Sequence, residues 1–62
     1  MKKLVVGQTV LYPLTAAEKE TYGYDVLPAI VLYVYETGNV DIEVAGTAGK
    51  LFKENISADG LS

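Results

Sequence analysis

The chain has 62 residues, no cysteine and no histidine, and its five lysines and eight acidic residues give a formal net charge of −3. A chain of this length forms one small domain, which we assign to residues 1–62, and it has no Cys/His cluster for a structural metal. An acidic domain without arginine argues against DNA or RNA as the main ligand, because phosphate binding relies on basic patches.

Half of the residues are hydrophobic, which is a high share for so small a domain. We expect part of this apolar surface to be covered by self-association or by docking onto another protein, with a well-packed monomer as the alternative. The longest apolar run, Val26–Tyr35, is too short to span a bilayer, so no membrane partner is expected. The opening Met1–Val6 imitates a signal peptide, but Gly7 ends the apolar run and favours a first strand.

The first part of the chain predicts β-structure and then a short helix. Leu4–Val6 and Thr9–Tyr12 are rich in strand formers, and we place Val10 and Tyr12 toward the core. Pro13 then limits further strand pairing. Thr15 with Glu18 three residues later matches a capping box, which predicts a helix of one to two turns over Ala16–Tyr22, ended by Gly23.

The second part predicts a hairpin. Leu27–Glu36 reads as a long strand, with Pro28 indicating an edge or an entry kink. Both of its faces are apolar, so we place Ala29 and Val31 inside, a bulge near Leu32–Tyr33, and Val34 inside again. A turn at residues 37–39 precedes Val40–Ala45, whose strict alternation is typical of a half-buried strand.

The last part predicts a flexible loop at residues 46–49, a fourth strand at Lys50–Lys53, a short closing segment at Asn55–Ser57 and a frayed tail at 58–62. Several short strands with one elongated early loop fit an all-β domain, a small five-stranded SH3-like barrel with the helix in the loop between the first two core strands. A mixed sheet with one packed helix is the alternative.

Three motifs carry a resemblance. They are Gly7, Val10 and Tyr12 of a "Gly-x-x-Val-x-Tyr" strand, the run Leu27–Val31, and Val40, Asp41, Ile42 and Val44 of the hairpin. Over residues 7–45 the chain resembles small accessory proteins of tailed bacteriophages with an SH3-like or Tudor-like fold. The resemblance implies a virion head or tail component, or an early protein acting on the host. It marks no catalytic residue.

Tyrosine is unusually abundant, with five in the chain. Tyr22, Tyr24 and Asp25 fall in the long early loop and Tyr35 on the central strand, and we predict an interaction surface from these four. Aromatic side chains in such positions bind proline-rich peptides, or cations when an acid such as Asp25 or Glu36 is close. A tyrosine also suits a half-buried strand, and this structural role is favoured for Tyr33 and Tyr35. For Tyr22 and Tyr24 it competes with a binding role, because a loop offers less reason to bury them.

Nothing in the sequence indicates catalysis, a metal or a cofactor. Asp41 and Glu43 share one face of an alternating strand, where carboxylates most often face solvent. The segment Gly46–Lys50 lacks the spacing of a phosphate loop. The usual pairs of nucleophile and base are missing, so we expect no enzyme activity.

The leading interpretation is therefore a non-enzymatic phage structural protein, either a head-decorating (cement) subunit or a small tail component bound to a larger protein lattice. The alternative is a soluble phage protein that binds and modulates a host enzyme. A nucleic-acid-binding barrel module ranks third because of the charge. The expected location is the virion or the host cytoplasm, and the expected partner is a phage capsid or tail protein, or a host protein.

Overall fold

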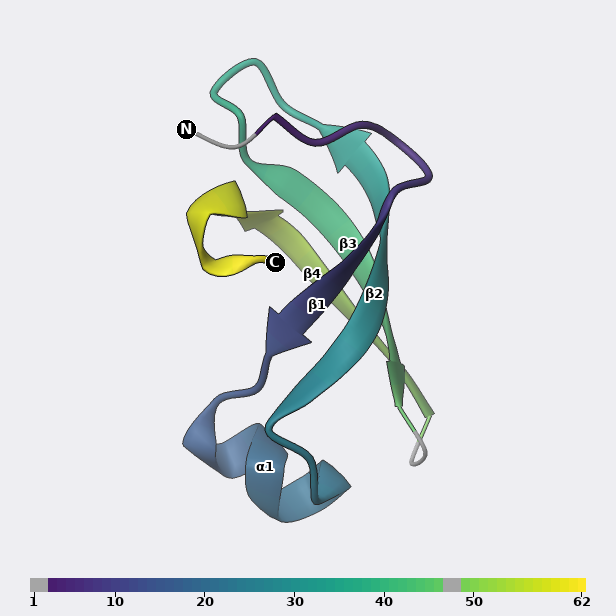
Figure 1. Ribbon diagram of the computed structural model, residues 1–62, viewed down its shortest axis with the longest axis vertical. Coiled ribbons are helices and arrows are strands. Elements are labelled where there is room, and N and C mark those ends of the chain that lie inside the picture. Colours follow the sequence, from purple (N-terminus) through teal and green to yellow (C-terminus); the bar gives the residue numbers. More distant parts are fainter. Residues whose placement is uncertain (1–2, 47–48) are drawn as a thin grey trace.

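A computed structural model describes residues 3–46 and 49–62. In this part of the chain four strands form one antiparallel sheet in the order β1-β2-β3-β4, and a short helix lies in the connection between β1 and β2 (Figure 1). The strands are β1 (Thr9–Pro13), β2 (Val26–Val34), β3 (Val40–Gly46) and β4 (Gly49–Ile56); the helix is α1 (Ala16–Tyr22), and a single 3₁₀ turn, η1, covers Ala58–Gly60. This small, mostly β fold agrees with the predicted class at that level. A fifth strand and a closed barrel are not shown by the described residues.

Helix α1 begins and ends as its sequence predicts. The Thr15 hydroxyl accepts a hydrogen bond from the Glu18 amide (3.3 Å), and the Glu18 carboxylate accepts one from the Thr15 amide (2.9 Å). This reciprocal capping satisfies two amides that would otherwise lack partners at the helix start. Gly23 ends the helix with φ 79°, a left-handed conformation that costs glycine little. The predicted bounds of Ala16–Tyr22 are confirmed.

Strand β2 pairs with β1 on one side and with β3 on the other, so both of its edges are paired. The register between β2 and β3 shifts between Val31 and Tyr33, which leaves Leu32 as the extra residue of a bulge. Ala29 and Val31 are buried before the bulge and Val34 packs against the core after it. The predicted change of face is confirmed.

Pro28 does not mark an edge strand, as one reading of the sequence expected, because β2 is paired on both sides. Its cross-strand partner Leu11 directs its own amide and carbonyl away from β2, to Ser62 (2.9 and 3.2 Å). Pro28 therefore lies at a pair without hydrogen bonds to β1. The β2–β3 register begins one residue later, at Ala29, so Pro28, which has no amide hydrogen to donate, lies just outside the ladder with β3.

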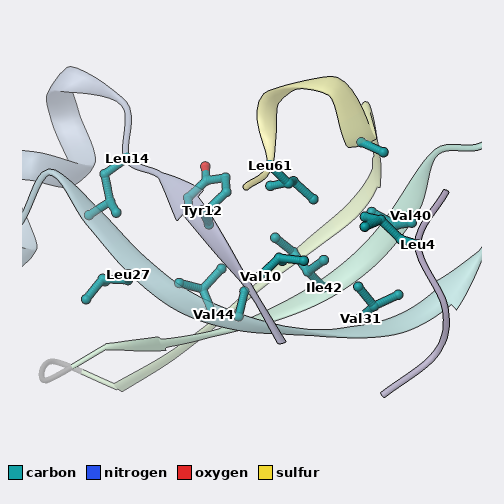
Figure 2. Packing of buried hydrophobic residues seen from close by; sticks show 12 residues of the cluster. Leu4, Val10, Tyr12, Leu14, Leu27, Val31, Val40, Ile42, Val44 and Leu61 are labelled. Atoms are coloured by element: carbon teal, nitrogen blue, oxygen red, sulfur yellow. The ribbon is translucent and has the colours of Figure 1, made fainter. Parts of the chain in front are cut away.

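The core lies on one face of the sheet. It contains Leu4, Val10, Tyr12, Leu14, Leu27, Ala29, Val31, Val40, Ile42, Val44, Ala58 and Leu61. The five residues predicted to be buried together, Val10, Val31, Val40, Ile42 and Val44, are each at most 2% exposed. Figure 2 shows Leu61 on the C-terminal turn, across from the strand residues of the sheet. The core is therefore enclosed between the sheet and the segments that carry Leu4, Ala58 and Leu61.

Three further expectations are corrected, and a fourth falls partly outside the described residues. Leu4–Val6 is not a strand, although Leu4 is buried. Strand β4 continues to Ile56, so the closing segment predicted at Asn55–Ser57 is largely the end of β4. The expected frayed tail instead forms η1 and buries Ala58 and Leu61, because these apolar side chains cover the open side of the core. The loop predicted at residues 46–49 includes Thr47 and Ala48, which lie outside the described residues.

Candidate functional site

The four residues predicted as an interaction surface do not lie together. Tyr22, Tyr24 and Asp25 belong to the end of α1 and the loop after it, whereas Tyr35 follows β2 at the opposite end of the sheet (Figure 1). The molecule measures 32 Å along its longest axis, so these positions do not form one binding site. Their role in binding stays a prediction for two separate regions.

At the helix end, Tyr22 and Tyr24 differ in exposure. Tyr22 is half-buried and packs against the core, and a Cβ added at Gly46 would meet its ring at 2.6 Å. Tyr24 is 47% exposed. The Asp25 carboxylate is almost fully exposed, 3.7 Å from the Lys19 ammonium. Exposure therefore favours Tyr24 and Asp25 as contact residues, while the packing of Tyr22 indicates a structural role.

At the other end, Tyr35 packs edge-to-face against Tyr33, with ring centroids 4.9 Å apart. Hydrogen bonding to Asp41, together with some burial, raises the pKa of the Tyr35 hydroxyl. The ring also lines a groove of about 400 Å³ between the N-terminal segment and the end of β2, beside Leu4, Val5 and Val34. Lys3 and Glu36 also line this groove, which therefore carries one positive and one negative charge. This balance favours neither anionic nor cationic ligands.

A further apolar surface is the side of the sheet opposite the core, which we call the outer sheet face. Cross-strand partners share a face, so the pairs Thr9–Ile30, Ile30–Glu43 and Glu43–Phe52 place these four side chains in one row across all four strands. Neighbouring rows hold Leu11 with Pro28, Pro13 with Val26, and Tyr33 with Asp41. Leu11, Val26, Ile30, Tyr33 and Phe52 are each between 44% and 59% exposed.

This surface was not among the predicted site residues. The sequence did contain a signal for it, because β2 is apolar at successive positions and an antiparallel strand with one solvated face normally alternates. Both faces of β2 therefore carry apolar side chains, one against the core and one outward. Periodicity by itself did not show which set faced outward.

A second feature without a sequence signal is a polar cluster that joins α1 to β1 and β4. Glu18 accepts hydrogen bonds from the Tyr12 hydroxyl (2.9 Å) and the Thr15 amide, and forms a salt bridge with Lys53. The Lys53 ammonium also lies 5.7 Å from the centroid of the Tyr12 ring. We refer to Tyr12, Glu18 and Lys53 as the polar cluster.

The polar cluster stabilises each of its ionisable groups in the protonation state that the group normally has at neutral pH: Glu18 ionised, Lys53 protonated and Tyr12 neutral. Burial by itself would raise the pKa of Glu18, but hydrogen bonds from Lys53, Thr15 and Tyr12 outweigh it and lower this pKa to about 2. The hydrogen bond to Glu18 raises the pKa of Lys53, and burial raises the pKa of Tyr12. General acid–base catalysis requires a pKa near the working pH, so these shifts fit a structural ion pair.

The described part of the chain, residues 3–46 and 49–62, offers neither a cluster of metal-ligating side chains nor a membrane-spanning helix. No cluster of three or more His, Cys, Asp or Glu side chains capable of holding a metal ion occurs there. None of its helices has the length and apolar character needed to cross a membrane.

The chain matches no protein-family model, no curated protein and no solved structure.

Proposed function

We propose that this protein is a non-enzymatic interaction protein of a bacteriophage particle, a head-decorating (cement) subunit or a small tail component that binds a larger protein lattice. One observation carries the binding role. Nine large apolar or aromatic side chains in the described residues are each at least 44% exposed, on a domain of only 62 residues. Five of them lie on the outer sheet face, and an apolar surface of this kind is typical of one that another protein covers.

The ionisable groups support binding in preference to catalysis. In the polar cluster the pKa of Glu18 is low and the pKa values of Tyr12 and Lys53 are raised, so none of the three exchanges a proton easily near neutral pH. Their contacts instead fix α1 against the sheet.

The assignment to a phage particle rests on the resemblance of residues 7–45 to phage accessory proteins, and so does the finer proposal of an SH3-like five-stranded barrel. Two features support the barrel. The bulge at Leu32 bends β2, and Leu11 and Ser62 exchange two backbone hydrogen bonds along the outer edge of β1. A closing fifth strand in a barrel would pair with β1 at this edge.

The test is quantitative mass spectrometry of purified virions of the phage that encodes the chain. We expect the protein at many copies per particle, as for a subunit repeated over a lattice, or at a small fixed number if it belongs to the tail. Absence from washed, intact virions would overturn the proposal and favour the modulator of a host enzyme. Samples of infected cells before lysis provide the control that the protein was expressed.

A further inference from the structure

We propose that the outer sheet face docks onto a protein surface with an apolar centre flanked by lysine or arginine side chains. This inference rests on the proposed function and names the docking face and the chemistry of its partner. Apolar side chains are concentrated on this face. Among the exposed apolar residues, Leu11, Val26, Ile30, Tyr33 and Phe52 all lie on this one face.

The outer sheet face also carries negative charge. Strand β3 contributes two carboxylates to the same face, Asp41 beside Tyr33 and Glu43 between Ile30 and Phe52. The Glu43 side chain is only 26% exposed, and its one salt bridge in the described residues, to Lys50, is long at 3.9 Å. A partner that covers this face removes more water from Glu43, which is favourable only if the partner supplies a positive charge.

The same charge argues against a second copy of the chain as the occupant. Glu43 lies near the middle of the face, so a two-fold contact centred there would bring the Glu43 carboxylates of both copies together. Each Lys50 already pairs with the Glu43 of its own chain. Repulsion between the two carboxylates, in an interface from which water is partly excluded, then opposes the dimer. A different protein with a basic rim would instead attract the Glu43 carboxylate.

The experiment uses two synthetic amphipathic helical peptides of equal length and equal apolar content, one built from leucine and lysine and the other from leucine and glutamate. Each is titrated into the full-length ¹⁵N-labelled protein while amide chemical shifts are followed. We expect the lysine peptide to shift the amides of Leu11, Ile30, Glu43 and Phe52, and to bind roughly tenfold more tightly than the glutamate peptide, because only it pairs with the carboxylates.

Two charge-reversal variants separate this face from general electrostatic attraction. Glu43→Lys and Glu20→Lys change the net charge equally, but Glu20 is exposed on α1, away from the outer sheet face. We expect Glu43→Lys to lower the affinity for the lysine peptide by roughly tenfold. Glu20→Lys should lower this affinity far less. Should Glu43→Lys fail to fold, Ile30→Ser and Phe52→Ser test the apolar part of the face, and Val6→Ser, at an exposed position in the turn before β1, is their control.

Several results would overturn the inference. The inference fails if both charge reversals lower the affinity for the lysine peptide equally, or if the parent protein binds the two peptides with equal affinity. It also fails if the chemical-shift changes are confined to α1 or to the groove at Tyr35, or if neither peptide binds. Sedimentation that reveals a dimer abolished by Ile30→Ser would identify a second copy as the occupant and would also overturn it. Mass spectrometry of virions tests where the protein resides, whereas the titration tests which face of the sheet binds a basic, apolar surface. Either experiment can therefore fail without the other.

Discussion

Glu18 on α1 and Lys53 on β4 form a salt bridge that joins the helix to the last strand of the sheet, and both side chains are largely buried, with 14% and 28% exposed. The Tyr12 hydroxyl donates a hydrogen bond to the same carboxylate from β1. Three elements that are distant in the chain therefore meet at one carboxyl group. Because Glu18 also caps α1, this one residue couples the start of the helix to the sheet.

Acid is expected to weaken this coupling. The pKa of Glu18 is about 2 in the folded chain, below the ordinary value of 4.5 that the unfolded chain retains. The stabilisation is therefore complete above about pH 4.5 and is lost as the pH falls toward 2. Glu18→Gln keeps a side chain that can cap the helix but removes the charge, so it should lower the free energy of unfolding at pH 7 by on the order of 2 kcal/mol.

The measurement is urea unfolding followed by circular dichroism between pH 2 and 7. The difference between Glu18→Gln and the parent should shrink toward pH 2. Glu20→Gln, on the exposed surface of the same helix, is the matched control and should follow the parent. A constant difference across the whole pH range would contradict the assigned pKa shift.

Truncation of Ile42 should be severely destabilising. Its side chain is fully buried on β3, and Ile42→Ala should cost about 2–5 kcal/mol, a large share of the stability of so small a domain. Ile30→Ala makes the same truncation on the opposite face of the sheet, where the side chain is 44% exposed, and should cost much less. Similar melting temperatures for the two variants would show that the core has been placed on the wrong face.

The close approach of Gly46 to Tyr22 predicts a specific coupling. Gly46→Ala places a methyl group 2.6 Å from the Tyr22 ring, so it should destabilise the fold by about 1–3 kcal/mol. Gly60→Ala, where the added carbon has no neighbour within 4 Å, is the control. In a double-mutant cycle, Tyr22→Leu should relieve part of the penalty of Gly46→Ala. Additive effects would mean that the ring does not contact this position.

Tyr24 should be separable from folding. Its side chain is about half exposed after α1, so Tyr24→Ala should leave the thermal midpoint nearly unchanged. If it contacts the lattice in the proposed particle, the variant should bind about 30-fold more weakly, the loss typical of an aromatic residue at the centre of an interface. Mass spectrometry of virions carrying the variant measures this as a reduced copy number, and an unchanged copy number would remove Tyr24 from the interaction surface.

Duplex DNA should not bind with useful affinity at physiological salt. The net charge is −3, and Lys19, Lys50 and Lys53 already pair with Asp25, Glu43 and Glu18. Few positive charges remain to replace counterions along a phosphate backbone. A gel-shift titration that gave sub-micromolar binding, weakening steeply as salt is raised, would reverse this expectation.

Local interactions made much of the fold predictable from the sequence. The capping box of Thr15 and Glu18 and the left-handed Gly23 fixed the bounds of α1, because the capping hydrogen bonds lie within the helix and its ends. The alternation of Val40, Ile42 and Val44 fixed the buried face of β3, because side chains of a strand alternate between its two faces. The bulge at Leu32 followed from the need to keep Val31 and Val34 on the same side of β2.

Only the tertiary structure decided the features that depend on distant partners. Both faces of β2 are apolar, so the outer sheet face became visible only when pairing with β1 and β3 showed which side chains meet in rows across the strands. The C-terminal residues looked like a frayed tail, yet Leu61 is buried against the core. Tyr22 and Tyr35 proved to lie at opposite ends of the sheet, and Lys53 to pair with Glu18. Such contacts join residues far apart in the chain, and neither periodicity nor capping, which act over a few residues, specifies them.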